Sequence, residues 1–240
     1  MGLSFYKDGT GLFAELPHPP IDLSICHIVE DAICATWNLL RTNPRPGFDL
    51  LNAQENTITH ELRERLLDEV FNKGVVPGFD KQLFTTIMRD PKVSSYDGSN
   101  INKMPDLIVS IYNRNVYKES QDGLFIECKP VDTAHSLCAH YCDKGVVRFV
   151  CGEYAWAMTN ALMVGYVCNG YSITPNLVDA LKDREKKIPT VIPPCPCQQS
   201  KPGKNNEVVH ISQHSRTFDY IQNGQPAPEI TLRHLWLRRD

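Results

Sequence analysis

Two apolar runs between residues 105 and 131 limit the possible folds more than any other feature of the chain. The first run, DLIVSIYN, begins at Asp106, and the second, GLFIEC, is followed directly by Lys129. Both runs are rich in β-branched and aromatic residues, and the polar segment between them is typical of a turn or a short excursion. The pattern therefore predicts two neighbouring antiparallel strands. Strand interiors are depleted in Asp, Glu and Lys, so the presence of charged residues on these runs has to be explained.

Strand alternation predicts where these charges point. Glu127 and Lys129 lie two residues apart and project from one face, whereas Ile126 and Cys128 project from the other. If the strand that begins at Asp106 pairs alongside, its carboxylate reaches the same corner. Mg²⁺ is a hard cation that prefers carboxylate and carbonyl oxygens. We therefore expect Asp106, Glu127 and the main-chain carbonyl of Cys128 to bind Mg²⁺, for which Mn²⁺ can substitute.

The rest of the chain alternates between helical and strand-like segments and contains no internal repeat. Apolar residues recur at helical spacing over residues 22–41, and a breaker, Asn43-Pro44-Arg45-Pro46, follows them. The same reasoning predicts helices over residues 22–41, 52–74, 146–163 and 175–187. It predicts strands over 83–88, 106–113, 123–128, 163–169, 207–216 and 229–239, and loops over 90–104 and 189–206.

The order of these segments indicates one α/β domain over residues 1–240. Hydrophobic residues make up 42% of the chain, enough for a sizeable core. Residues 1–46 would form an N-terminal arm, over residues 1–20, and a helix. Residues 50–170 would form a core in which helices flank a central mixed β-sheet. Residues 171–240 would be a C-terminal elaboration that ends in two strands.

Pro105-Asp106, followed after 20 residues by Glu127-Cys128-Lys129, resembles the PD-(D/E)XK motif of the restriction-endonuclease-like nucleases. The expected order of helix, three strands, helix and strand is similar to that family's common core. The resemblance implies a Mg²⁺-dependent deoxyribonuclease, expected to be an endonuclease, in which Asp106 and Glu127 hold metal and Lys129 positions the nucleophile. By fold analogy alone, it also suggests a role in restriction or anti-phage defence.

Members of this superfamily often carry one more acidic residue on the first core helix, and this chain offers Glu55 and Glu61. On an ideal helix with Ile58 at zero, Glu55 falls at about 60°, inside the apolar arc, and Glu61 at about 300°, outside it. A carboxylate is unusual on the apolar face of a helix, and metal binding would explain it. Glu55 is therefore our candidate to complete the metal shell. The alternative is that Glu55 only closes a capping box with Asn52.

Arg148 is a candidate for contact with the scissile phosphate, because a guanidinium matches phosphate oxygens. An ion pair with Glu153 or Asp143 explains it equally well, and the sequence leaves both readings open. We expect Tyr154, a few residues further on, to be a packing residue.

Ser212, His214 and Arg216 alternate along a predicted strand and would share one face. This row is a candidate substrate-binding surface, with His214 and Arg216 contacting a phosphate. The alternative is an ordinary solvated strand face.

The composition narrows the class of partner. The net charge is −3, and DNA-binding domains usually carry a basic surface, so we expect a protein partner or a homo-oligomer to bring the chain to DNA. The nine cysteines are expected to be free thiols, because the chain shows no secretion signal. Cys195 and Cys197, with His210 and His214, have the chemistry of zinc ligands, but one residue between the cysteines is too few, so structural zinc is not expected.

No apolar run reaches the length of about 18 residues that a membrane span needs, so we expect a soluble, cytoplasmic protein without a membrane partner. Two functions rival a deoxyribonuclease. One is an inactive nuclease-like fold that binds nucleic acid or protein, and the other is a nuclease directed at RNA. A cysteine nucleophile is not favoured, because alternation turns Cys128 toward the core.

Overall fold

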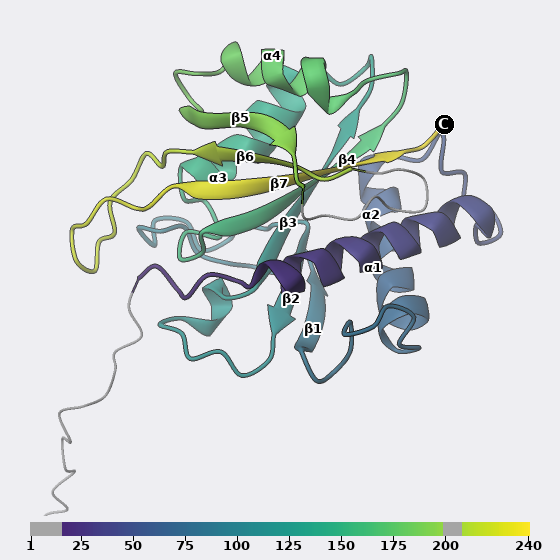
Figure 1. Cartoon of the computed structure of the whole chain (residues 1–240), viewed down its shortest axis with the longest axis horizontal. Coiled ribbons are helices and arrows are strands. Elements are labelled where there is room, and N and C mark those ends of the chain that lie inside the picture. Colours follow the sequence, from purple (N-terminus) through teal and green to yellow (C-terminus); the bar gives the residue numbers. More distant parts are fainter. Residues whose placement is uncertain (1–15, 199–207) are drawn as a thin grey trace, which may run out of the picture.

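One mixed β-sheet of seven strands forms the centre of the computed structural model, which describes residues 16–198 and 208–240 (Figure 1). The strands lie side by side in the order β1-β2-β3-β4-β7-β6-β5. They are β1 Phe84–Arg89, β2 Leu107–Ile111, β3 Leu124–Val131, β4 Asn160–Val167, β5 Thr190–Pro196, β6 His210–His214 and β7 Ile230–Arg238. The prediction of an α/β protein with a mixed sheet and C-terminal strands is confirmed.

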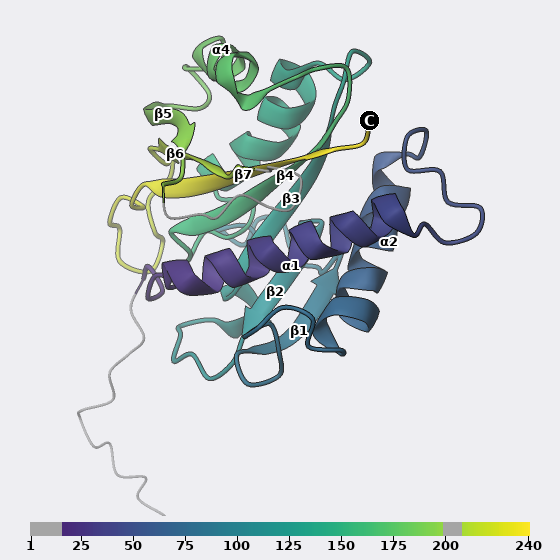
Figure 2. The ribbon, with the colours of Figure 1, turned by 45° about the vertical axis from the view of Figure 1, so that its right-hand side comes forward.

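Helices cover both faces of the sheet (Figure 2). α1 and α2 pack on the face where Tyr166 stacks on Trp37 and contacts Thr59. On the opposite face Gly145 lies against the side chain of Lys129. The helical segments are α1 Leu23–Thr42, α2 Glu55–Arg65, α3 Val147–Val150 and α4 Val178–Lys182, with π-helical stretches at Leu66–Phe71, Leu137–Val146 and Ile173–Leu177 and a 3₁₀ turn at Glu119–Gln121.

The strand pairing explains the apolar character of the middle of the sheet. β2 is antiparallel to β1 and to β3, as the two apolar runs predict. β3, β4 and β7 are parallel to one another, and β5 and β6 continue the sheet in antiparallel fashion. All eight residues of β3 are buried, because helices cover both faces of a parallel centre. Charged side chains on β3 therefore lie inside the protein.

α1 matches the predicted first helix. The Asp22 carboxylate caps it by accepting a hydrogen bond from the Ser24 amide at 2.7 Å. By length and composition alone α1 could cross a membrane, although half of its most apolar window is buried in the fold. Buried Glu30 of α1 forms an ion pair with buried Arg233 of β7. These are contacts of a core helix, and a cytoplasmic location stays a prediction.

The second helix begins later than predicted. α2 starts at Glu55 and no side chain caps it, so the predicted capping box is wrong. The Asn52 side chain instead donates to Asp49 at 2.7 Å. Gly74 follows the helical stretch with φ of 60°, a conformation that favours glycine and stops a helix.

The helix predicted over residues 146–163 is confirmed only over residues 146–150. The helical segment begins earlier than predicted and runs from Leu137 through Val150. It ends where Gly152 and Ala155 adopt φ of 72° and 51°, because left-handed residues interrupt a right-handed helix. The apolar residues after the helix are buried in a turn that leads to β4. They are apolar because the turn is buried, and not because they form one face of a helix.

Three further boundaries differ. Asp106 precedes β2, and β3 extends past Lys129. Residues 190–196, predicted as loop, form β5 at the sheet edge, where proline is tolerated because one side of the strand needs no ladder hydrogen bonds. Most of the predicted N-terminal arm, residues 199–206 of the predicted loop and residue 207 of the following strand lie outside the described residues.

Candidate active site

The register between β2 and β3 brings the charged residues of the two apolar runs together. Leu107 pairs with Ile126, and one further antiparallel step places Asp106 opposite Glu127. The Cys128 amide donates to Asp106 Oδ2 at 2.6 Å, which holds this carboxylate at the strand end. Lys129 Nζ lies 2.8 Å from Glu127 Oε1 and 3.5 Å from Asp106 Oδ2. The predicted meeting of two carboxylates and an ammonium is therefore present.

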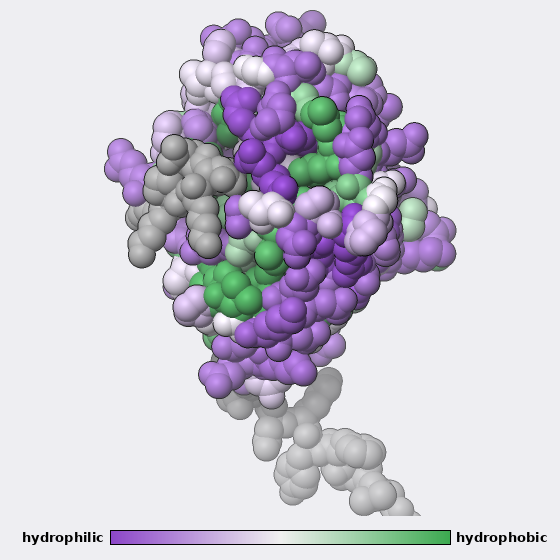
Figure 3. Space-filling view, turned by 90° about the vertical axis from the view of Figure 1, so that its right-hand side faces the viewer, coloured by the Kyte–Doolittle hydropathy of each residue, from purple (hydrophilic) through white to green (hydrophobic). Residues whose placement is uncertain are grey.

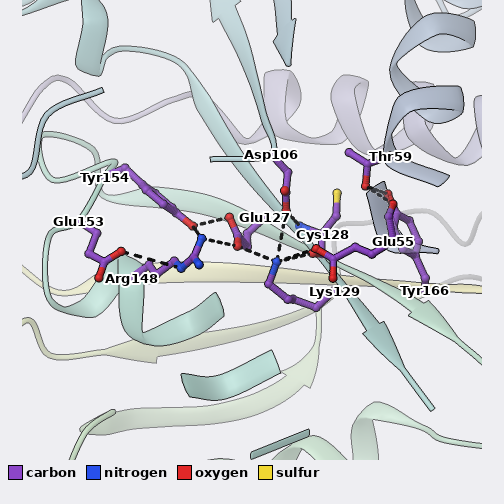
Figure 4. A network of polar contacts seen from close by, with 10 residues as sticks. All are labelled: Glu55, Thr59, Asp106, Glu127, Cys128, Lys129, Arg148, Glu153, Tyr154 and Tyr166. Atoms are coloured by element: carbon purple, nitrogen blue, oxygen red, sulfur yellow. Dashed lines mark hydrogen bonds and ion pairs between the residues drawn. The ribbon is translucent and has the colours of Figure 1, made fainter. Parts of the chain in front are cut away.

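Glu55 joins this group from the first turn of α2. Its Oε1 lies 3.0 Å from Lys129 Nζ, and the Cys128 carbonyl accepts from the same ammonium at 2.7 Å (Figure 4). Glu61 lies elsewhere and pairs with Arg45 at 3.5 Å. The structure thus brings Glu55, rather than Glu61, to the cluster. We name the group of Glu55, Asp106, Glu127 and Lys129 the acid–lysine corner.

The corner passes from the buried core to the surface. Glu127 is 0% exposed, Lys129 8%, Asp106 15% and Glu55 29%. Burial, together with the Asp106 carboxylate, raises the pKa of Glu127 to about 7, although Lys129 and Arg148 oppose this shift. Burial also lowers the pKa of Lys129, but the three carboxylates outweigh burial and raise that pKa above its usual range. The ammonium is therefore charged at neutral pH.

Two residues outside the motif complete the surroundings of Glu127. The Tyr154 hydroxyl donates to Glu127 Oε2, and Arg148 donates to Oε1 at 3.1 Å. Arg148 also approaches Glu153 at 3.9 Å, whereas Asp143 pairs with Arg184 instead. One of the two alternatives for Arg148, an ion pair with Glu153, is thus present. Its contact with phosphate stays a prediction.

Sequence reasoning missed the hydrogen bond of Tyr154. Tyr154 is fully buried, as a packing residue would be, but its hydroxyl also holds a buried carboxylate. The predicted helix through this segment gave no reason to turn Tyr154 toward β3. The turn after α3 provides that orientation, and the sequence carries no signal for it.

His214 and Arg216 do not join the corner. Ser212 and His214 share a face, as predicted, but both are buried and hydrogen-bond to each other at 2.7 Å. Arg216 lies beyond the end of β6 and donates to the carbonyls of Trp156 and Met158 at 2.6 and 2.7 Å. The expected exposed substrate-binding row is therefore corrected to a set of internal contacts. The reason is tertiary packing, because Ser212 also hydrogen-bonds to His234 of β7 at 2.7 Å and the turn over residues 155–158 encloses Arg216.

The potential zinc ligands also have separate partners. Cys195 Sγ lies 3.7 Å from the Ile211 carbonyl, and Cys197 Sγ lies 3.8 Å from Arg233. Among residues 16–198 and 208–240, no three or more His, Cys, Asp and Glu side chains are grouped as a ready-made metal site.

The donor chemistry of the acid–lysine corner nevertheless fits a hard cation. Three carboxylates and one carbonyl oxygen face a single position, and these are the ligand types that Mg²⁺ prefers. The cation that they surround in this structure is the ammonium of Lys129. Above about pH 7, where Glu127 is ionised, three carboxylates against the two positive charges of Lys129 and Arg148 leave a net negative site. The residues that would hold Mg²⁺ are Glu55, Asp106, Glu127 and the carbonyl of Cys128.

Comparisons of the chain with protein-family models, with curated proteins and with solved structures gave no significant match. The geometry of the site and the residues themselves are therefore the basis of any functional assignment.

The buried Glu127 carboxyl should make metal-free stability depend on pH. The unfolded chain releases this proton from about pH 4.5 upward, whereas the folded protein keeps it to about pH 7. Raising the pH across this range therefore lowers the free energy of unfolding, by up to about 3 kcal/mol. Urea unfolding in EDTA at several pH values should show this loss in the wild type and not in Glu127→Gln. If the wild type and Glu127→Gln lost stability equally with rising pH, this prediction would be contradicted. The control is Glu119→Gln, at an exposed position, which should show the same pH dependence as the wild type.

Proposed function

We propose that the protein is a Mg²⁺-dependent phosphodiesterase that cleaves DNA, with a restriction-endonuclease-like core. One observation carries the proposal. The carboxylates of Glu55, Asp106 and Glu127 and the carbonyl of Cys128 converge on one point, which the Lys129 ammonium occupies. This oxygen-rich arrangement is what phosphodiester hydrolysis with a hard metal ion requires.

The topology supports the proposal. A helix, the antiparallel strands β1, β2 and β3, a second helix and parallel β4 follow one another in the order expected from the resemblance. The acids lie where β2 begins and on β3, and Glu55 comes from the helix packed across them. A structural ion pair would need only one acid beside Lys129, whereas three converge on it.

Each residue has a role that its position supports. Mg²⁺, when bound, would stabilise negative charge on the phosphate and lower the pKa of a water molecule. Lys129 lies beside all three acids, so its ammonium would orient the attacking water and stabilise the transition state. Tyr154 and Arg148 hold the Glu127 carboxylate in place. Arg148 is one-third exposed, so it would also be able to contact the scissile phosphate.

The biological setting is inferred from the net charge and from the resemblance. The net charge of −3 favours delivery to DNA by a protein partner or through a homo-oligomer. We include a cytoplasmic role in restriction or anti-phage defence in the proposal. This part rests on analogy with the restriction-endonuclease-like nucleases that the motif resembles.

One observation favours a second candidate, an inactive nuclease-like fold that binds nucleic acid or protein. The ammonium of Lys129 already satisfies the three carboxylates. A group of side chains that balances its charges internally can be purely structural.

Cleavage assays separate the two candidates. We expect the full chain to nick circular DNA in Mg²⁺ or Mn²⁺ and to be inactive in EDTA, because the carboxylates need the metal to act on a phosphate. Gel electrophoresis of circular DNA, linear DNA and RNA of matched sequence measures the activity and its substrate. If only RNA is cleaved, the protein is a ribonuclease rather than a deoxyribonuclease. If no substrate is cut and calorimetry detects no Mg²⁺ binding, the inactive fold is correct.

A further inference from the structure

A cavity of about 640 Å³ adjoins the acid–lysine corner. It shares Glu55 with the corner and reaches Pro130, the residue after Lys129. The loop between α1 and α2 and the C-terminal end of the chain form part of its wall, and both lie at the right of Figure 1. Figure 3 looks at this side of the molecule, which is mainly hydrophilic. The volume falls in the range of about 300–1,000 Å³ that small-molecule sites have.

The lining of the cavity suits a nucleobase better than a phosphate. Asn52, Gln54 and Asn56 bring three carboxamides to it, and each carboxamide carries both donors and an acceptor. Gln54 and Asn56 are exposed, and their side chains make no hydrogen bond within the described part of the chain. Asn and Gln side chains are the common partners of base edges.

The charges of the lining support the same choice. Glu55 and Asp132 carry negative charge, and Arg239 is the only lining residue that is always positively charged. Arg239 donates to the carbonyls of Leu50 and Ala53 at 3.0 and 2.8 Å, so its guanidinium holds the loop rather than facing a ligand. A surface of this kind repels a polyanionic backbone and accepts a neutral, polar base.

Asp132 and His135 add an oriented ring to the wall. The His135 Nδ1 lies 2.8 Å from Asp132 Oδ1, and the Asp132 carboxylate also accepts from the His135 amide at 3.0 Å. Because the Asp132 carboxylate can only accept, the Nδ1–H of the imidazole points to it and orients the ring. The ring is 40% exposed, so one face or edge is open to a ligand.

We propose that this cavity binds one unpaired nucleobase of the strand that is cut at the acid–lysine corner. The proposal rests on the function proposed above and specifies its substrate as single-stranded or locally unpaired DNA. A base must leave the duplex stack to enter a concave site, because pairing occupies its hydrogen-bonding edge. Glu55 lines the cavity and is also a proposed metal ligand, so it would link recognition of the base to the reaction.

Binding measurements test this proposal independently of cleavage. We would measure fluorescence anisotropy of a labelled 12-nucleotide single strand and of its blunt duplex with the full chain in Ca²⁺. The single strand should bind at least about tenfold more tightly. Gln54→Ala/Asn56→Ala should weaken binding of the single strand about tenfold, the size of loss expected for base contacts, and His135→Ala should weaken it as well. A matched control, Gln82→Ala/Asn115→Ala, removes two exposed amides elsewhere and should bind like the wild type.

A series of single strands, each lacking one base at a different position, locates the contact. Removing the base at one position next to the cleaved bond should weaken binding to the wild type as much as Gln54→Ala/Asn56→Ala does. The double variant should bind that strand no more weakly than it binds the intact strand. Equal binding of duplex and single strand, or unchanged binding by the cavity variants, overturns the cavity proposal. If the wild type still cuts DNA in that case, the nuclease proposal stands. Absence of binding to any nucleic acid overturns the cavity proposal, and absence of cleavage as well overturns both.

Discussion

Asp106→Asn is expected to lower the DNA cleavage rate by about 10³-fold or more while leaving the fold intact. The Cys128 amide donates to Asp106 Oδ2 at 2.6 Å, and the carbonyl oxygen of asparagine can accept the same hydrogen bond. The strand end should therefore keep its shape. The substitution removes one of the three negative charges of the acid–lysine corner, and a neutral amide is a much poorer ligand for a hard cation. A loss of about 4 kcal/mol in transition-state stabilisation corresponds to this rate.

The measurement compares initial nicking rates of the two proteins in Mg²⁺ with their circular dichroism and unfolding midpoints. Asp68→Asn is the matched control, because Asp68 is exposed and its ion pair within the described part of the chain is with Arg45, at 4.0 Å. It should cleave at the wild-type rate. Cleavage by Asp106→Asn at the wild-type rate would show that the acid–lysine corner is not the active site, whatever activity the protein has.

Lys129→Met is expected to lower the free energy of unfolding by about 3–5 kcal/mol at pH 8 without metal. Lys129 Nζ is the cation shared by Glu55, Asp106 and Glu127. Removing one partner of a buried ion pair leaves the other charges uncompensated, which is the costly way to break such a pair. Arg148 remains near Glu127 at 3.1 Å, but it does not contact the other two acids. Methionine keeps the length of the side chain, so lost packing contributes little.

The same variant should respond more strongly to Mg²⁺ than the wild type does. With the ammonium gone, a divalent cation is the remaining way to neutralise three carboxylates. Mg²⁺ at about 100 times its dissociation constant would restore about 3 kcal/mol. Urea unfolding with EDTA or with Mg²⁺ measures both effects. Lys103→Met, which removes a partly exposed pair with Glu153 at 3.0 Å, should change stability by at most about 1 kcal/mol. An equal response to Mg²⁺ in all three proteins would argue against a metal site.

Local patterns predicted the centre of the site correctly. Strand alternation placed Glu127 and Lys129 on one face and Cys128 on the other, and the helical angle of Glu55 favoured it over Glu61. These patterns work because a strand repeats every two residues and a helix every 3.6. Asp106 needed one more inference, the antiparallel pairing of the two runs, which the register confirms.

Patterns failed where apolar residues are buried for other reasons. The segment after Val150 is apolar and was predicted to be helical, yet Gly152 and Ala155 turn it back toward β3. Tyr154 reaches Glu127 from this turn, and no periodicity signals a single hydrogen bond of that kind. His214 was expected at the surface, because the alternation of one strand does not show which face another element covers.

The sequence by itself determined the α/β class, the strand pair that carries Asp106 and Glu127, and the chemical types that meet beside Lys129. These features follow from local geometry and from the free-energy cost of burying charged side chains on apolar strands. The sequence favoured Glu55 as a candidate, but only the tertiary structure decided that Glu55 and Tyr154 reach the site. The packing of α2 across β3 brings Glu55 within 3.0 Å of Lys129, and the turn after α3 brings Tyr154 to the far oxygen of Glu127. Such contacts depend on how whole elements pack, because the residues that make them lie far apart along the chain.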